Sequence, residues 1–137
     1  MTQANEHAIA GCILGTAVGD AMGLACEGLS RRRQAKMFPD LSGYHLLFGK
    51  GMTSDDTEHT CMLAQSVIAY SGANADEKKI FASFAWRLRF WLLGLPAGIG
   101  LATLRSILKL WLGFPAHRSG VFSAGNGPAM RCAFLGI

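Results

Sequence analysis

Glycine recurs at every fourth position near the start of the chain, at Gly11, Gly15, Gly19 and Gly23. In an α-helix this spacing lines the four glycines along one flank, which rotates slowly around the axis. Each interior glycine costs a helix about 1 kcal/mol relative to alanine, so a helix over residues 5–29 requires a compensating contact. We therefore expect another backbone to approach this flank closely. A different face of the same helix carries its predicted core residues, Ile9, Cys12, Ile13, Ala17 and Leu24.

Helical periodicity continues beyond this segment. Apolar residues repeat at helical spacing over residues 54–71, and similar patterns predict helices over residues 76–93, 101–112 and 128–137. We expect residues 30–52 to form a long irregular connection, of a kind that is often functional or mobile, and residues 113–127 to form a loop. No segment favours a strand, so the sequence predicts an all-α fold. A length of 137 residues suits a single domain spanning residues 1–137.

Composition and charge argue against a disordered chain and against a nucleic-acid partner. Half of the residues are hydrophobic and 16% are charged, which argues against disorder. The net charge of +4 is modest, and the only dense basic run, Arg31 to Arg33, has no aromatic residues within it. A solvated loop is favoured there over a nucleic-acid patch, and no nucleic-acid partner is expected.

The cysteines and the most apolar stretch bear on location. None of the four cysteines forms a Cys-x-x-Cys pair, which favours reduced thiols in a cytoplasmic protein. The N-terminus has no basic segment followed by an uninterrupted apolar run, so we expect no signal peptide. Residues 90–114 are strongly apolar, but Pro96 interrupts them and Arg105 and Lys109 lie within them. A buried pair of helices is therefore favoured over a membrane span.

The sequence Thr53-Ser54-Asp55-Asp56-Thr57 places two adjacent carboxylates between hydroxyl groups at a predicted helix start. Hard cations such as Mg²⁺ prefer oxygen ligands and take one or two carboxylates together with water. Neighbouring side chains of a helix point about 100° apart, so the two aspartates could ligate two ions or bracket one. The alternative is a helix capped by Ser54, whose acids complement the helix dipole.

Two further acids, Asp20 and Glu27, interrupt the apolar N-terminal helix. Their separation is about two helical turns, which places both on nearly the same face of a continuous helix. Acids are seldom buried without partners. These two residues therefore face either a polar cleft or solvent.

A glycine-rich turn precedes the last predicted helix and comprises Ser123, Ala124, Gly125, Asn126 and Gly127. Glycine lets backbone amides approach a ligand, and a helix N-terminus favours a phosphate group. Asn126 could bind a sugar or phosphate oxygen. The alternative is an ordinary Asn-Gly turn before a helix with Pro128 in its first position. Gly98 and Gly100 precede another predicted helix in a weaker version of this pattern.

In this order, the three motifs resemble those of the ADP-ribosylglycohydrolase family. The pattern of glycines around Asp20 is similar to the family's opening helix. Ser54-Asp55-Asp56-Thr57 resembles its Thr-Asp-Asp-Thr metal motif, and Gly125 to Arg131 resembles its Gly-Asn-Gly-x-x-Met-Arg segment. The resemblance implies an all-α, orthogonal multi-helix bundle around a cleft that holds a pair of Mg²⁺ ions.

By this resemblance the site residues fall into groups. The implied metal ligands are Ser54, Asp55 and Asp56. The residues implied to bind ADP-ribose are Ser123, Gly125, Asn126 and Gly127, with Gly98 and Gly100 on the phosphate side. Glu27 matches an acid near the metals, and either Glu27 or Asp55 would act as the general base. Asp20 is expected to have a structural role.

The resemblance also implies a hydrolase that uses metal-activated water to remove ADP-ribose from a modified protein side chain or a small conjugate. Other members are about twice as long, and their second half supplies an Asp-x-Asp-Thr motif that no aspartate here matches. We therefore expect a truncated member with little activity alone, whose exposed apolar surface favours self-association. The alternatives are a non-catalytic binding or structural module and an unrelated magnesium-dependent phosphohydrolase built on Asp55 and Asp56.

Overall fold

The computed structural model describes residues 3–46, 48–70, 75–96, 99–125 and 127–135. The helices in these ranges are α1 (Gln3–Gly23), the 3₁₀ helix η1 (Leu24–Cys26), α2 (Arg31–Met37), α3 (Asp55–Tyr70), α4 (Glu77–Leu93), α5 (Leu101–Trp111), α6 (Ala116–Ser119) and α7 (Gly127–Leu135). No strand occurs in the described residues, and the predicted all-α class is confirmed.

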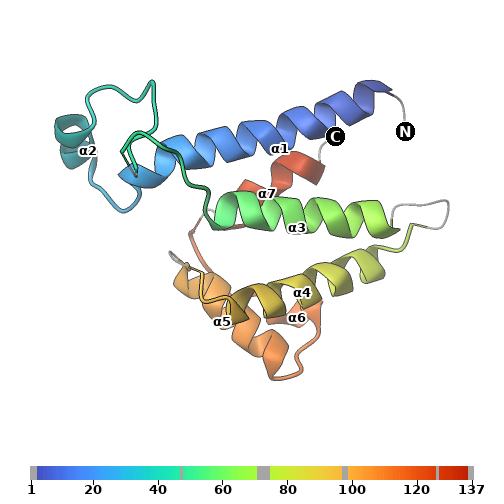
Figure 1. The fold of residues 1–137 in the computed structure, drawn as a ribbon. Helices are drawn as coiled ribbons and strands as arrows, with labels where there is room; N and C mark the ends of the chain where they lie inside the picture. The colour runs from blue at the N-terminus through green and yellow to red at the C-terminus, as the bar shows by residue number, and fades with distance from the viewer. Residues whose placement is uncertain (1–2, 47, 71–74, 97–98, 126, 136–137) are drawn as a thin grey trace.

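Helix α3 lies at the centre of the fold. It packs against α1, α4 and α7, while α4 also contacts α5 and α6. In Figure 1, α1, α3 and α4 run alongside one another in alternating directions, and α5 runs across α4. The apolar core consists mainly of Leu63 and Ala64 of α3, Ala85 and Leu88 of α4, and Ile107 and Leu110 of α5. Helix α3 therefore connects the N-terminal helix to the rest of the chain.

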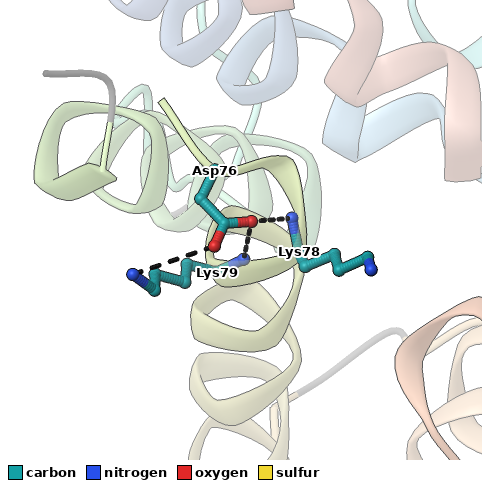
Figure 2. A network of polar contacts seen from close by, with 3 residues as sticks. All are labelled: Asp76, Lys78 and Lys79. Carbon is teal, nitrogen blue, oxygen red and sulfur yellow. Dashed lines mark hydrogen bonds and ion pairs between the residues drawn. The ribbon is translucent and has the colours of Figure 1, made fainter. Parts of the chain in front are cut away.

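A carboxylate from the preceding residue caps the start of α4. Asp76 is extended, and its Oδ1 accepts hydrogen bonds from the backbone N–H groups of Lys78 and Lys79, at 3.0 and 3.4 Å (Figure 2). The Lys79 ammonium lies 3.8 Å from Oδ2. Asp76 is therefore the N-cap of α4, as a helix predicted to begin at residue 76 allows, and both oxygens of its carboxylate are engaged.

The expected irregular connection over residues 30–52 is wrong in part, because Arg31–Met37 forms α2. Ser30 is extended and begins this helix, and Pro39 follows its end, where proline is common because it cannot continue a helix. The arginine run therefore lies on a helix. Short helix α6 likewise lies within the expected loop over residues 113–127, and α1 ends at Gly23, earlier than predicted.

The glycine flank of α1 is bare. A Cβ atom added to Gly11, Gly15, Gly19 or Gly23 would meet no atom within 4 Å among the described residues. The expected close approach of another backbone is therefore not made by this part of the chain. The face predicted to be core is half-buried, and the neighbouring side chains of Leu14 and Val18 are 65% and 46% exposed.

The chain exposes a large apolar surface. Its accessible surface is 9350 Å², whereas a compact monomer of 14.6 kDa exposes about 6,900 Å² by the usual scaling with mass. Large apolar side chains contribute to the excess on several helices, including Phe81, Trp86, Phe90 and Leu101.

Among the described helices, one is long and apolar enough to cross a membrane, the stretch Asn5–Cys26 with a mean hydropathy of 1.6. Core helices of soluble proteins and N-terminal signal sequences share this length and composition. The other apolar stretch, residues 90–114, forms the end of α4 and the whole of α5 as two separate helices, as the interruption at Pro96 predicts.

Candidate functional site

Asp20 of α1 caps the start of α3. Its carboxylate accepts hydrogen bonds from the backbone N–H and the hydroxyl of Ser54, both at 2.7 Å. It also accepts from the backbone N–H and the hydroxyl of Thr57, at 3.1 and 2.5 Å. Burial by itself raises the pKa of Asp20, but the hydrogen bonds from Thr57 and Ser54 together outweigh it and hold the pKa below its ordinary value. These contacts give Asp20 a structural role between the two helices.

Because Asp20 supplies the cap, Asp55 and Asp56 in the first turn of α3 are not used to cap the helix, whereas the third acid of that turn, Glu58, accepts a hydrogen bond from the Trp91 indole N–H. Ser54, which was expected to cap the helix with its own side chain, donates its hydroxyl to Asp20 instead. In the described part of the chain, neither Asp55 nor Asp56 forms an ion pair, and the only hydrogen bond to either carboxylate comes from the Asp55 backbone. Both side chains are half-buried.

Burial raises the pKa of both Asp55 and Asp56. The charge of Asp20 raises both pKa values further, and Asp55 also raises that of Asp56, whereas the positive charge of Arg131 lowers both. A bound cation would relieve this repulsion and replace the hydration that burial has removed. The electrostatics of this helix start therefore favour a hard cation.

Glu27 joins these acids by a different route from the one expected. Helix α1 ends at Gly23, and Glu27 follows η1 in an extended conformation with φ −61° and ψ 137°. The prediction that Asp20 and Glu27 share a helix face is therefore wrong. Partial burial, followed by the charges of Asp55, Asp56 and Asp20, raises the pKa of Glu27. Asp20, Glu27, Asp55 and Asp56 thus form one electrostatic group, called the acidic cluster below.

Two residues that the sequence analysis did not single out tie α7 to α3. His59 is fully buried one turn after Asp55, and its Nδ1 lies 2.6 Å from Nη2 of Arg131. Burial, and then the charge of Arg131, lower the pKa of His59 to about 3, so the imidazole is neutral near pH 7. Burial lowers the pKa of Arg131, whereas the charges of Asp55 and Asp56 act in the opposite direction.

A second contact joins the same two helices. Thr60 is fully buried, and its hydroxyl lies 2.7 Å from the carbonyl oxygen of Asp56 and 3.2 Å from that of Met130. Both contacts to α7 come from the second and third residues after the Ser54–Thr57 motif, His59 and Thr60. Two features of the sequence could have drawn attention to these residues. His59 follows Asp55 by four positions, which is one helical turn, and Arg131 belongs to the Met130-Arg131 pair that ends the glycine-rich motif.

The two glycine-rich segments meet at the start of α5. A Cβ atom on Gly100 or Gly127 would lie 3.9 or 3.8 Å from the same atom, the hydroxyl oxygen of Thr103. The N-terminal ends of α5 and α7 are therefore close together, and Figure 1 shows both on the side of the molecule where α3 begins. Thr103 is a further residue at this junction that sequence reasoning missed.

The structure describes four of the six residues predicted to bind ADP-ribose, namely Gly100, Ser123, Gly125 and Gly127. The Ser123 hydroxyl accepts a hydrogen bond from the N–H of Gly125 at 3.0 Å, which forms a tight turn before α7. Ser123 and Gly125 are exposed. Gly98 and Asn126 lie outside the described residues. Ser123, Gly125 and Gly127 are called the glycine-rich segment below.

The donors at the start of α3 suit a hard cation only in part. Ser54, Asp55 and Asp56 offer hydroxyl and carboxylate oxygens, and Mg²⁺ usually binds proteins through one or two carboxylates and keeps several waters. Among the described residues, no group of three or more His, Cys, Asp or Glu side chains lies close enough to hold a metal ion. Ser54, Asp55 and Asp56 therefore offer oxygen ligands to a cation, but the described residues do not provide a complete coordination sphere.

Two surface grooves lie away from these residues. One, of about 580 Å³, runs between α3 and α4, and the other, of about 340 Å³, lies beside α2. The larger groove is lined by Met62, Gln65, Ser83, Trp86, Arg87, Phe90 and Trp91. Neither groove includes a residue of the acidic cluster or of the glycine-rich segment.

Fold and site together define an all-α protein in which an acidic cluster and two glycine-rich helix starts converge beside α3. The sequence model of the ADP-ribosylglycohydrolase family matches residues 1–137, and the chain belongs to this family. The chain is 33% identical over 137 residues to an uncharacterized protein of Archaeoglobus fulgidus, a match that covers 96% of this chain. In an alignment of 127 residues that covers 89% of this chain, it is 32% identical to the ADP-ribosyl-[dinitrogen reductase] glycohydrolase of Rhodospirillum rubrum.

The same matches cover 43% of the Archaeoglobus fulgidus protein and 41% of the Rhodospirillum rubrum protein. The chain therefore spans about two fifths of the length of the curated relatives that it matches.

Proposed function

We propose that this chain contributes to a hydrolase that removes ADP-ribose from modified proteins or small ADP-ribose conjugates. One observation carries the proposal furthest: with the cap supplied by Asp20, Asp55 and Asp56 form no ion pair with any residue that the structure describes, and their pKa values are raised, within the motif that resembles the family's metal site. Family membership supports the reaction type, and the Rhodospirillum rubrum relative is named as a glycohydrolase of ADP-ribosyl-[dinitrogen reductase].

In this proposal, Ser54, Asp55 and Asp56 hold Mg²⁺. When bound, the metal supplies a polarised water of lowered pKa beside the glycosidic bond. Glu27 or Asp55 accepts a proton from water as the general base, and the raised pKa of both carboxyl groups brings them nearer the range where a base is effective. Gly100 and Gly127, at the starts of α5 and α7, offer backbone N–H groups to the diphosphate, whereas the N–H of Gly125 is donated to Ser123 within the turn.

Calorimetry of the full 137-residue chain with Mg²⁺, followed by ADP-ribose, tests the proposal. We expect weak Mg²⁺ binding, because the described residues offer few ligands. The double variant Asp55→Asn, Asp56→Asn should lose this binding. Asp76→Asn is the matched control, since Asp76 caps α4 instead, and it should retain the binding. No binding of either ligand at millimolar concentration would overturn the proposal.

Competition separates ADP-ribose chemistry from a general phosphohydrolase. Free ADP-ribose should displace a fluorescent ADP-ribose conjugate, and simple phosphate esters should not. The reverse result would favour a magnesium-dependent phosphohydrolase built on the same aspartates. We also expect poor turnover of an ADP-ribosylated peptide by these 137 residues alone, and rapid hydrolysis would contradict that expectation.

The second candidate is a non-catalytic binding or structural module, which the extent of exposed apolar surface favours. The total accessible surface, polar and apolar, is 9350 Å², against about 6,900 Å² for a compact monomer of this mass, and side chains such as Phe81, Trp86 and Phe90 are more than half exposed. We propose that this surface drives self-association of the isolated chain. Analytical ultracentrifugation should show a dimer or larger species whose population rises with protein concentration, and a monomer at all concentrations would refute self-association.

A further inference from the structure

The contact between His59 and Arg131 specifies the protonation of a buried histidine. A guanidinium group can only donate hydrogen bonds, so Nδ1 of His59 must accept from Nη2 of Arg131 at 2.6 Å. The imidazole is neutral, and its proton therefore sits on Nε2. Within the described residues, this buried Nε2–H finds no hydrogen-bond partner, and neither does Nε of Arg131.

Leaving a buried N–H unpaired costs free energy. A position that served only to fill the core would be better occupied by an apolar residue, such as Leu63 or Ala64 on the same helix. At this position the chain has a histidine, and its Nδ1 accepts a hydrogen bond from Arg131. The hydrogen bond to α7 is therefore the property that distinguishes His59 from an apolar core residue.

Aromatic groups from α4 fix the pair from a second direction. The Trp91 ring lies edge-on to the imidazole, with ring centroids 4.2 Å apart. The Arg131 guanidinium lies 5.6 Å from the centroid of Phe84. His59 and Arg131 are thus held between three helices and have little freedom to rearrange.

The position of this pair along both helices relates it to the site. His59 lies one turn after Asp55 at the start of α3, and Arg131 lies one turn after Gly127 at the start of α7. The bond therefore joins the second turns of the two helices, and the neighbouring contact between Thr60 and Met130 reinforces it. The glycine-rich segment leads into the first turn of α7, and Asp55 and Asp56 lie in the first turn of α3.

We propose that His59 and Arg131 are positioning residues that hold the glycine-rich segment in register with the acidic start of α3, and so set the affinity for the ADP-ribose ligand rather than for the cation. The ligand part of this inference rests on the proposed function. The docking of α7 rests on the contacts alone and is measured separately.

NMR spectroscopy of the full chain tests the docking. In the wild-type chain, long-range ¹H–¹⁵N correlations should show His59 with a bare Nδ1 and a protonated Nε2. His59→Leu should lower the hydrogen-exchange protection of the α7 amides by about tenfold or more, whereas His59→Asn, which retains an acceptor near the Nδ1 position, should restore it. A proton on Nδ1, or unchanged α7 protection in His59→Leu, would overturn the inference.

Arg131→Met is the second variant in case His59→Leu does not fold. It keeps an unbranched side chain that can pack against Phe84, and it removes the donor to His59. It should lower α7 protection in the same way, and Arg131→Lys, which keeps one donor, should show a smaller loss. Equal protection in the methionine and lysine variants would count against a hydrogen-bonding role.

Ligand titrations then separate positioning from general destabilisation. His59→Leu should weaken ADP-ribose binding by about tenfold while changing Mg²⁺ affinity by less than about twofold, and His59→Asn should recover most of the loss. Equal weakening of both ligands would assign His59 a merely structural role and overturn the positioning inference. If the wild-type chain binds neither ligand, the proposed function fails, and the NMR result alone decides whether His59 docks α7.

Discussion

Helices α3 and α4 are neighbours of similar length that both begin with acidic residues, yet their starts are built differently. At α4, the capping carboxylate is local, because Asp76 accepts from the amides of its own first turn and pairs with Lys79 (Figure 2). At α3, the capping carboxylate is Asp20, which lies 34 residues before Ser54 on another helix. Asp76 therefore stabilises the start of its own helix, whereas Asp55 and Asp56 take no part in the cap of α3.

The difference between α3 and α4 shows how a helix start can be capped and still carry carboxylates that take no part in the cap. A helix N-terminus favours negative groups through its unpaired N–H groups and its dipole. Once Asp20 satisfies the amide of Thr57, Asp55 and Asp56 are surplus to the cap, and burial with mutual repulsion raises their pKa values. A cap from a distant residue therefore does two things at once, since it docks α1 on α3 and leaves two carboxylates available.

The largest expected effect comes from removing the distant cap. Asp20→Ala loses four hydrogen bonds to a charged group and the main polar tie between α1 and α3. We expect a loss of about 2–4 kcal/mol in the free energy of unfolding, less than the sum of four charged bonds because water reaches this half-buried site. Urea denaturation of the full chain measures it.

Asp20→Asn serves as the control for charge. The amide keeps one acceptor oxygen and should therefore retain part of the stability that the alanine variant loses. Stability of Asp20→Ala within about 0.5 kcal/mol of wild type would show that α3 does not depend on α1 for its cap.

Removal of the local cap should cost less. Asp76→Ala leaves the N–H groups of Lys78 and Lys79 without their carboxylate, and an N-cap of this kind contributes about 1 kcal/mol. Lys79→Ala should change stability by less than about 0.5 kcal/mol, because its ion pair with Asp76 is exposed. If Asp76→Ala destabilised the chain more than Asp20→Ala in urea denaturation, the contrast between the two helix starts would be wrong.

The same two helix starts show what a sequence reveals by itself. The cap at Asp76 is a short-range pattern, so the start of α4 could be predicted from adjacent residues, and the spans of α3 and α5 follow equally from their periodicity. The cap at Ser54 was assigned to the wrong side chain, because the competing acceptor, Asp20, is remote in sequence. Short helix α2 was missed because an arginine run without first-turn acids lacks the usual signals of a helix start.

The site was predictable to the extent that its motifs are local. Asp55 and Asp56 stand out as a pair, and Glu27 proves to be near them although the helical argument for it fails. The contact between His59 and Arg131 spans 72 residues, so although both residues stand near recognisable motifs, their pairing is seen only in the structure. The glycine flank of α1 shows the reverse case, in which a clear pattern predicts a packing partner that the described residues do not supply.

The smallest expected effect distinguishes the capping carboxylate at the start of α3 from the two aspartates beside it, by the sign of their pH dependence. Asp20 has a lowered pKa in the folded chain, so its contribution to stability is present above its unfolded pKa of about 3.9 and is lost as the pH falls through the folded value. Asp55 and Asp56 have raised pKa values, so the folded chain binds protons there more readily than the unfolded chain. Their contribution to the free energy of unfolding therefore declines as the pH rises from about 4 through their raised pKa values in the folded chain. At pH values above those pKa values, both carboxylates are charged and oppose folding.

The double variant Asp55→Asn, Asp56→Asn removes this decline. Near neutral pH it should be more stable than the wild-type chain by less than about 1 kcal/mol, since both groups remain partly exposed to water. The gain should shrink as the pH falls toward 4. The quantity to measure is the difference in unfolding free energy between variant and wild type across this range. The effect of His59 on the pH dependence, which is the same in both proteins, largely cancels in that difference.

Added Mg²⁺ should stabilise the wild-type chain and leave the variant unchanged, because a cation and the double substitution relieve the same repulsion. A variant that is less stable at neutral pH would mean that the two aspartates support the start of α3 as Asp76 supports that of α4, and the two helix starts would then differ only in where the cap comes from.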